Sequence, residues 1–217
     1  MNYYLNKLYL YGIEKLKEKK MKKLILVTSP PGCGKTYVSK QLAKQLKHVV
    51  YLDKDTLIPL SKQIFVAADE EYNRSSDFFE KYIRNYEYET IVDLALEALE
   101  YDDIVLINAP FKEEIRNENY IQNLKNRLKE KNASLVVVWI ETTMEICKQR
   151  MIARNSDRDT WKLANWDEYI AGENFDIPTA LDDPKVIDDL LIFKNSSDEE
   201  FNESMEGIID ILEETTK

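Results

Sequence analysis

The sequence predicts a three-layer α/β fold in which helices cover both faces of a five-stranded parallel sheet. Short apolar runs alternate along the chain with longer segments whose apolar residues recur at helical spacing. A chain of 217 residues with 44% hydrophobic residues can bury one substantial core but is short for two. Because parallel strands need long crossover connections, alternating strands and helices favour a parallel sheet within a single α/β domain.

The elements follow one another in a regular order. Strands are predicted at 24–28, 49–52, 104–108, 135–140 and 190–193. Helices are predicted at about 35–46, from about 55 onward, and at 76–100, 115–131, 143–155 and 198–214. Residues 1–22 have the spacing of a short amphipathic helix, so we expect an N-terminal helical extension at 1–22 and one domain at 23–217.

Composition excludes several classes of protein. The formal net charge of −10 argues against a general affinity for nucleic acid. The apolar runs are far too short to span a bilayer and the N-terminus does not resemble a signal peptide, so we expect a cytoplasmic protein with no membrane partner. Cys33 and Cys147 stand in unrelated contexts, which predicts free thiols. The oligomeric state stays open.

The strongest motif joins the first predicted strand to the helix after it. Residues 29–36 read Ser-Pro-Pro-Gly-Cys-Gly-Lys-Thr, the phosphate-binding loop pattern with Ser29 in place of its first glycine. Backbone N–H groups of such a loop surround an anion at a helix N-terminus, Lys35 adds a charge, and the Thr36 hydroxyl can bind Mg²⁺. We expect ATP and Mg²⁺ here, with nucleotide contacts from Pro31, Gly32, Cys33, Gly34, Lys35, Thr36 and Tyr37.

Two aspartates follow the second predicted strand. Residues just beyond the C-terminal end of a parallel strand face the crevice where ligands bind, which places Asp53 and Asp55 there. A carboxylate at that position can accept the proton of an attacking hydroxyl or support a magnesium shell. Asp55 is the expected base, and Asp53 is an expected substrate and metal contact beside Thr36. A role for Asp55 in helix capping alone stays open.

The third predicted strand ends in Asn108 and not in an acid. ATP-driven machines end a strand near the phosphate loop in carboxylates that hold Mg²⁺ and activate water, so Asn108 disfavours that class. At the same edge of the sheet, Asn108 offers an amide and Phe111 an apolar face to a substrate. The aromatic stretch 72–88 also contains arginines, and Arg84 is the expected acceptor contact within it.

Arginines recur at a spacing of four near the end of the predicted helix 143–155. Arg150 and Arg154 share one helical face, and Arg158 lies near or just beyond the helix end. Guanidinium groups match phosphate oxygens and stack on bases, so this segment suits a lid that closes over ATP and stabilises charge on the transferring phosphoryl group. A solvated charged helix gives the same pattern, and the upstream phosphate loop favours the lid.

Together these motifs resemble the P-loop small-molecule kinases, which include nucleoside and nucleotide kinases, chloramphenicol phosphotransferase and zeta-toxin-like kinases. SPPGCGKT, LDKDT at 52–56 and RMIARNSDR at 150–158 carry the resemblance, which spans about residues 23–214. It implies a P-loop NTPase fold with a helical arginine lid, a base corresponding to Asp55, and an adenine pocket at Asn195. A broader description as an AAA-type ATP-binding protein also fits the loop.

The resemblance implies an ATP- and Mg²⁺-dependent phosphotransferase that acts on a hydroxyl of a small molecule, such as a nucleoside. Two alternatives stay open. One is a regulatory ATP-binding protein or ATPase with no small-molecule acceptor. The other is a polynucleotide 5′-hydroxyl kinase, which needs a basic channel for the strand and is disfavoured by the acidic net charge.

Overall fold

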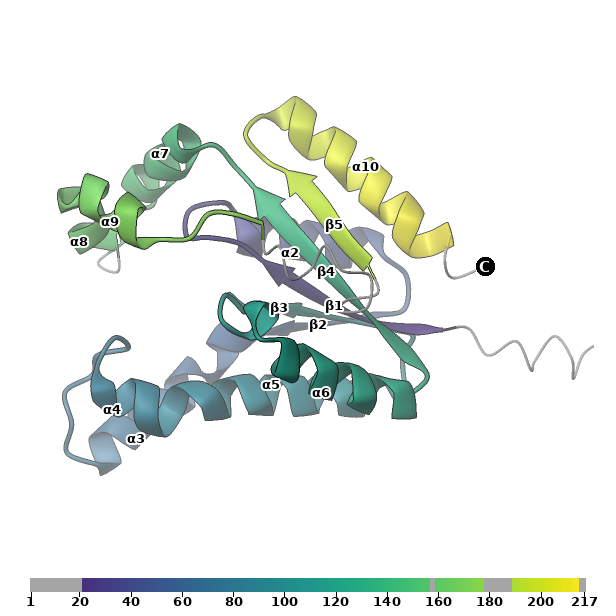
Figure 1. Ribbon diagram of the computed structural model, residues 1–217, viewed down its shortest axis with the longest axis horizontal. Coiled ribbons are helices and arrows are strands. Elements are labelled where there is room, and N and C mark those ends of the chain that lie inside the picture. The colour runs from purple at the N-terminus through teal and green to yellow at the C-terminus, as the bar shows by residue number, and fades with distance from the viewer. Residues whose placement is uncertain (1–20, 157–158, 178–188, 215–217) are drawn as a thin grey trace, which may run out of the picture.

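The computed structural model describes residues 21–156, 159–177 and 189–214. Its five strands form one sheet in the order β2-β3-β1-β4-β5 (Figure 1). These strands are β1 (Lys22–Thr28), β2 (Val49–Asp53), β3 (Ile104–Asn108), β4 (Ala133–Glu141) and β5 (Asp189–Lys194). Every neighbouring pair is parallel, which confirms the predicted sheet. The loops that follow the strands therefore meet at one edge.

Helices cover both faces of this sheet, as predicted (Figure 1). Successive side chains of β1 point to opposite faces, so Leu24 lies in one core and Ile25 in the other. The first core is closed by α5 (Asn85–Ala98) and α6 (Glu118–Glu130), and the second by α2 (Lys35–Gln45) and α10 (Asp198–Glu214). Because its strands are buried on both faces, the chain shows continuous apolar runs.

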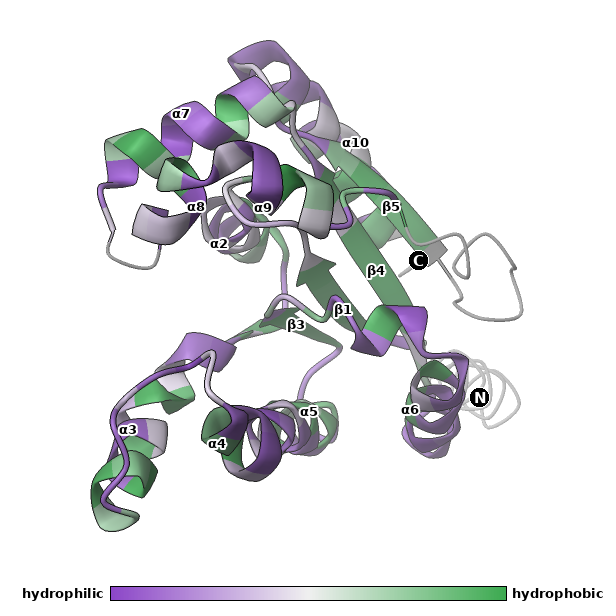
Figure 2. Cartoon of the chain, turned by 60° about the vertical axis from the view of Figure 1, so that its left-hand side comes forward, coloured by the Kyte–Doolittle hydropathy of each residue, from purple (hydrophilic) through white to green (hydrophobic). Residues whose placement is uncertain are grey.

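Two helical arms extend beyond the edge where the strands end, one on each side in both views (Figures 1 and 2). The first contains η1 (Lys54–Leu57), α3 (Ile58–Ala67), α4 (Asp77–Phe79) and the π-helical turn η2 (Glu80–Arg84), and the second contains α7 (Met144–Arg154), α8 (Thr160–Ala164) and α9 (Trp166–Gly172). None of the helices within the described ranges is long and apolar enough to cross a membrane. Except for Met21 and Lys22, the expected N-terminal extension lies outside the described residues.

A buried charged cluster ties the first arm to α5, a helix that packs against the sheet. Glu87 of α5 accepts hydrogen bonds from Lys54 Nζ at 2.6 Å and from Ser61 Oγ at 2.5 Å, and Arg74 donates both terminal nitrogens at 2.7 Å. Burial alone raises the pKa of Glu87, but the hydrogen bonds from Arg74, Lys54 and Ser61 outweigh it and lower the pKa to about 2. Since Lys54 precedes Asp55, the cluster also fixes the turn after β2.

Replacing Glu87 with Ala is expected to lower the free energy of unfolding by about 3–5 kcal/mol, because Lys54 is left buried without its carboxylate. The folded pKa of Glu87 lies below its ordinary value of 4.5, so the ionised carboxylate stabilises the fold above that value. Its contribution is lost as the pH falls from about 5 towards 2. Urea unfolding should show that the difference in the free energy of unfolding between wild type and Glu87→Ala shrinks as the pH falls across this range. The control is Glu97→Ala, an exposed position on α5, which should change the free energy of unfolding by less than about 0.5 kcal/mol.

Candidate active site

The phosphate-binding loop has the backbone that its sequence requires. Gly32 and Gly34 adopt φ values of +85° and +88°, which residues with a Cβ atom rarely adopt. A Cβ at Gly34 would lie 2.6 Å from Asn195 Nδ2, and one at Gly32 would lie 2.8 Å from Met151 Cε. Helix α2 starts directly after Gly34. Its N-terminus, the end that attracts anions, therefore opens onto the loop.

Cys33 contributes to this loop through its backbone. Its side chain is buried, and its Sγ lies 3.4 Å from the Sγ of Cys147 on α7. Both cysteines are free thiols, as predicted, although the fold brings them into contact. The Cys33 carbonyl also accepts hydrogen bonds from Asn195 Nδ2 at 2.7 Å and from Arg150 Nη1 at 3.3 Å. The loop is thereby attached to both α7 and the end of β5.

A polar network joins the ends of β2 and β3 to the phosphate-binding loop that follows β1. Asn108 is almost fully buried, and its Oδ1 accepts a hydrogen bond from Lys35 Nζ at 2.6 Å. Its Nδ2 donates to Asp53 Oδ2 at 2.9 Å and to Thr36 Oγ1 at 3.3 Å. An amide can serve a cation and a carboxylate at once because it carries both an acceptor and a donor. An acid at position 108 would repel Asp53, which explains the neutral residue there.

The same network suits a magnesium ion bound together with ATP. The Thr36 hydroxyl and the Asp53 carboxylate both contact the Asn108 amide, and both are the oxygen ligands that Mg²⁺ prefers. Within the described ranges, no group of three or more His, Cys, Asp or Glu side chains forms a metal cage. Magnesium in phosphate-transfer sites typically uses one or two protein ligands with phosphate oxygens and water, so these residues fit it.

Asp55 faces the loop across a cavity of about 580 Å³, which Lys35, Thr36 and Arg154 also line. The helical turn η1 is capped by Asp53, whose Oδ1 accepts a hydrogen bond from the Asp55 backbone N–H at 3.0 Å. The side chain that caps η1 is therefore that of Asp53. The Asp55 carboxylate is exposed at the wall of the cavity.

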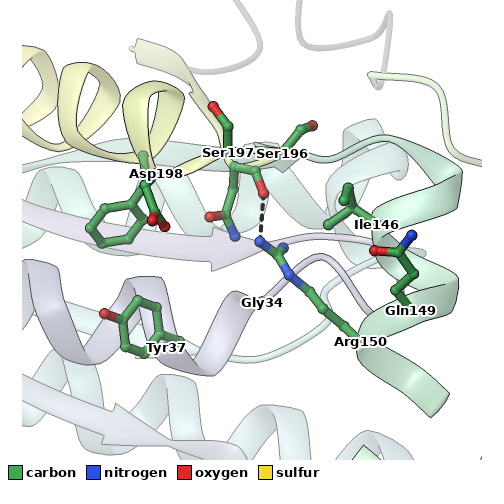
Figure 3. Close-up of a pocket in the computed structure, with 10 residues that line it drawn as sticks. Gly34, Tyr37, Ile146, Gln149, Arg150, Ser196, Ser197 and Asp198 are labelled. Atoms are coloured by element: carbon green, nitrogen blue, oxygen red, sulfur yellow. Dashed lines mark hydrogen bonds between the residues drawn. The ribbon is translucent and has the colours of Figure 1, made fainter. Parts of the chain in front are cut away.

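A second cavity of about 420 Å³ lies next to the first at the predicted adenine pocket (Figure 3). Arg150 reaches from α7 and donates from Nη2 to the Asn195 carbonyl at 2.8 Å, and Tyr37 of α2 lies 5.4 Å from the ring of Phe201. Gly34, Tyr37 and Arg150 line both cavities. A nucleotide can therefore place its base in one cavity and its phosphates in the other.

The second arm brings further charged groups to the larger cavity. Arg154 lines it and donates from Nε to Asp159 Oδ2 at 2.8 Å, with a second contact from its terminal nitrogen. Asp159 is fully buried, and its other oxygen has no hydrogen-bond partner among the described residues. Arg158, the third expected lid arginine, lies outside the described residues.

Three charged lining residues were not predicted from the sequence: Lys112, Asp159 and Lys162. Lys112 comes four residues after Asn108, which ends β3, so its position shortly after a strand could have indicated that it lines the cavity. Asp159 and Lys162 lie after the arginine helix, where no pattern distinguishes them from surface charges.

Two expected acceptor contacts lie elsewhere in the structure. Arg84 pairs with Glu114 at 2.9 Å, stacks over the Tyr88 ring, and lines a separate cavity of about 280 Å³. Phe111 is fully buried with its ring 5.2 Å from that of Tyr88, so it belongs to the core. Neither side chain is among the described residues that line the phosphate cavity.

Comparisons with known proteins agree with this fold. A family model described as an AAA domain matches residues 24–172, more than half of the chain. A candidate kinase from Chloroflexus aurantiacus has a similar structure, with a TM-score of 0.55 and 16% identity over 91% of this chain and 100% of that chain. The predicted resemblance to P-loop kinases is confirmed for the fold.

Two further structures are similar at low identity. One comes from the PezAT toxin-antitoxin system of Streptococcus pneumoniae, with a TM-score of 0.55 and 15% identity over 97% of this chain and 94% of that chain. The other is a gluconokinase from Sinorhizobium meliloti, with a TM-score of 0.50 and 13% identity over 92% of this chain and 100% of that chain. No curated protein matches the chain.

Proposed function

We propose that this chain, which belongs to the AAA-domain family, is an ATP-dependent phosphotransferase that moves the γ-phosphoryl group to a hydroxyl of a small molecule. One observation carries the proposal. The cavity that contains Lys35 at the phosphate loop also contains Asp55 after β2 and Arg154 of the second arm, and it continues into a base-sized pocket. A cation, a carboxylate and an arginine around one space are the groups that phosphoryl transfer to a hydroxyl requires.

ATP occupies the two cavities in this proposal. Its base lies between Tyr37 and the residues that follow β5, and its phosphates lie on the loop at the N-terminus of α2. Lys35, held by Asn108, stabilises negative charge on the phosphate oxygens. When bound at Thr36 and Asp53, Mg²⁺ supplies charge neutralisation at those oxygens.

Asp55 acts on the acceptor. Its carboxylate takes the proton of the attacking hydroxyl while the bond from the acceptor oxygen to the γ-phosphorus forms. The bond from that phosphorus to the bridging oxygen breaks, and ADP leaves with the electron pair. Arg154 faces the same space and stabilises charge on the transferring group, and Asp159 holds its guanidinium in place.

Formation of ADP with a panel of acceptors tests this function. The full chain with Mg²⁺ and ATP is assayed against nucleosides, nucleotides, sugars, sugar acids and aminoglycosides. One class should raise the rate at least about tenfold above the rate with water, because Asp55 is positioned to activate a bound hydroxyl. Mass spectrometry should find that acceptor phosphorylated. Equal ADP formation with every acceptor would instead indicate an ATPase.

Replacing Arg150 with Ala is expected to raise the KM for ATP about 10- to 100-fold, since its guanidinium lines both cavities and holds the carbonyls of Cys33 and Asn195. Steady-state kinetics at varied ATP measures this effect. The matched control is Lys148→Ala, two positions earlier on α7, where the side chain lies over the Trp166 ring and lines neither nucleotide cavity. An unchanged KM in Arg150→Ala would remove Arg150 from the nucleotide site.

A further inference from the structure

The phosphate cavity is positively charged although the chain is acidic. Its described lining side chains comprise two carboxylates, on Asp55 and Asp159, and five cations, on Lys35, Lys112, Arg150, Arg154 and Lys162. The whole chain has a formal net charge of −10. A cavity of the opposite sign concentrates anions from solution and disfavours cationic ligands.

ATP accounts for only some of these cations. Lys35 sits at the phosphate loop, and Arg150 points towards the base pocket, where it contacts the Asn195 carbonyl. Arg154 is held by Asp159 beside the transferring group. Lys112 and Lys162 have no role in nucleotide binding in this arrangement, and they come from different parts of the fold.

The order of the sheet places these lysines relative to the substrate. In the order β2-β3-β1-β4-β5, the base pocket follows β5 and the phosphate loop follows β1 in the centre. Asp53 and Asn108 are register partners at the ends of β2 and β3, so the loops that carry Asp55 and Lys112 leave the sheet from neighbouring strands on the other half. In the proposed complex, base, phosphates and acceptor would therefore follow one another across the sheet edge, and Lys112 comes from the loop after β3 on the acceptor half.

Lys162, from the second arm, lines the same cavity as Lys112. Lys112 forms an ion pair with Glu173, which follows α9, and Lys162 Nζ lies 3.9 Å from Asp159 Oδ1. Burial lowers the pKa of Lys162, the Asp159 carboxylate partly offsets this effect, and the positive charge of Lys112 lowers the pKa further. Two ammonium groups that face one cavity from separate elements form a site for an anion.

The arginines of the aromatic stretch do not line this cavity. Arg74 is bound by both oxygens of Glu87, and Arg84 is bound by Glu114 in a different cavity. An acceptor beside Asp55 thus meets lysines from the β3 loop and from α8, and not the arginines of the first arm.

We propose that the phosphoryl acceptor is an anion and that Lys112 and Lys162 bind its phosphate or carboxylate group. This inference rests on the proposed function and names the acceptor class of the same site. The acceptor presents its hydroxyl to Asp55, and its anionic group reaches the two lysines. The bound anion then contacts both the β3 loop, through Lys112, and the second arm, through Lys162.

Matched pairs of acceptors test the proposal on the full chain. A nucleoside is compared with its 5′-monophosphate, and an aldose with its aldonic acid and its sugar phosphate. In at least one pair the anionic member should have a kcat/KM about tenfold or more above that of the neutral member. Preference for the monophosphates or for the acid identifies the anion as phosphate or carboxylate.

Variants then assign the effect to the lysines. Lys112→Met and Lys162→Met should each raise the KM for the anionic acceptor about 10- to 100-fold and leave the KM for ATP unchanged. Lys62→Met, on an exposed lysine of α3 outside the cavity, is the matched control and should change neither constant. Thermal unfolding of each variant checks that the fold is retained.

The variant Glu173→Gln distinguishes a role of Lys112 in binding the acceptor from a purely structural role. It removes the internal partner of Lys112, so the KM for the anionic acceptor should fall, opposite to the effect of Lys112→Met. If the ion pair only held the arm in place, both variants would break it and shift KM in the same direction, which would overturn the proposal.

Failure of this inference and failure of the proposed function give different results. A neutral acceptor that is phosphorylated as efficiently as its anionic counterpart, with no effect of either lysine variant, overturns this inference and leaves the kinase function intact. Absence of phosphorylation with every acceptor overturns the proposed function and the inference with it.

Discussion

Replacing Asp55 with Asn is expected to lower kcat for phosphoryl transfer by about 10²- to 10⁴-fold, which is the usual contribution of a positioned general base. The amide keeps the size of the side chain but cannot accept the proton of the attacking hydroxyl. The KM for ATP should stay unchanged, because the nucleotide contacts lie at the loop and at the pocket after β5. Steady-state kinetics at saturating acceptor measures both constants.

Asp77→Asn is the matched control for Asp55→Asn. Asp77→Asn changes an aspartate at the start of α4, outside the phosphate cavity, and should leave kcat unchanged. The backbone N–H of Asp55 donates to Asp53, and this cap does not depend on the side chain at position 55. Asp55→Asn should therefore fold normally. A kcat equal to that of wild type would show that Asp55 is not the base.

Replacing Lys35 with Ala is expected to reduce transfer by about 10³-fold or more. The ammonium group lies 2.6 Å from Asn108 Oδ1 at the mouth of the loop, where it meets the phosphates. Removing it leaves the phosphate charge uncompensated in both the bound state and the transition state, so kcat and ATP affinity should fall together. Lys40→Ala, on an exposed lysine of the same helix, is the matched control.

Thermal unfolding gives a second measurement for Lys35. A ligand at 100 times its Kd stabilises the folded state by about 2.7 kcal/mol, so MgATP should raise the Tm of wild type and of Lys40→Ala. The same concentration should have little effect on Lys35→Ala, while its Tm without nucleotide matches wild type. A full shift in Lys35→Ala would mean that the loop binds ATP without its lysine.

Much of the fold could be predicted because its signals are local. The strands are buried on both faces and appear as continuous apolar runs, and the loop glycines occupy positive φ values that few residues tolerate. The segment predicted as one helix at 76–100 is helical, but η2 inserts a π turn between α4 and α5. A single wider turn hardly disturbs apolar periodicity, so the pattern does not reveal it.

The candidate site was predictable only where its residues follow strand ends or a motif. Asp55 and Arg150 were identified in this way, and both line the cavities. Arg84 and Phe111 were selected for residue type, and composition cannot tell a pocket wall from a core or from an ion pair. Lys112 and Lys162 come to line the same cavity through tertiary structure alone.

The partition of the γ-phosphoryl group between acceptor and water tests the central claim most directly. ATP labelled at the γ-position is incubated with the full chain, Mg²⁺ and the acceptor that most increases ADP formation. The labelled acceptor and labelled inorganic phosphate are then quantified for wild type and Asp55→Asn. Wild type should place most of the label on the acceptor, and Asp55→Asn should lose this product. Label found only in inorganic phosphate, at the same rate with and without acceptor, would contradict the proposed function.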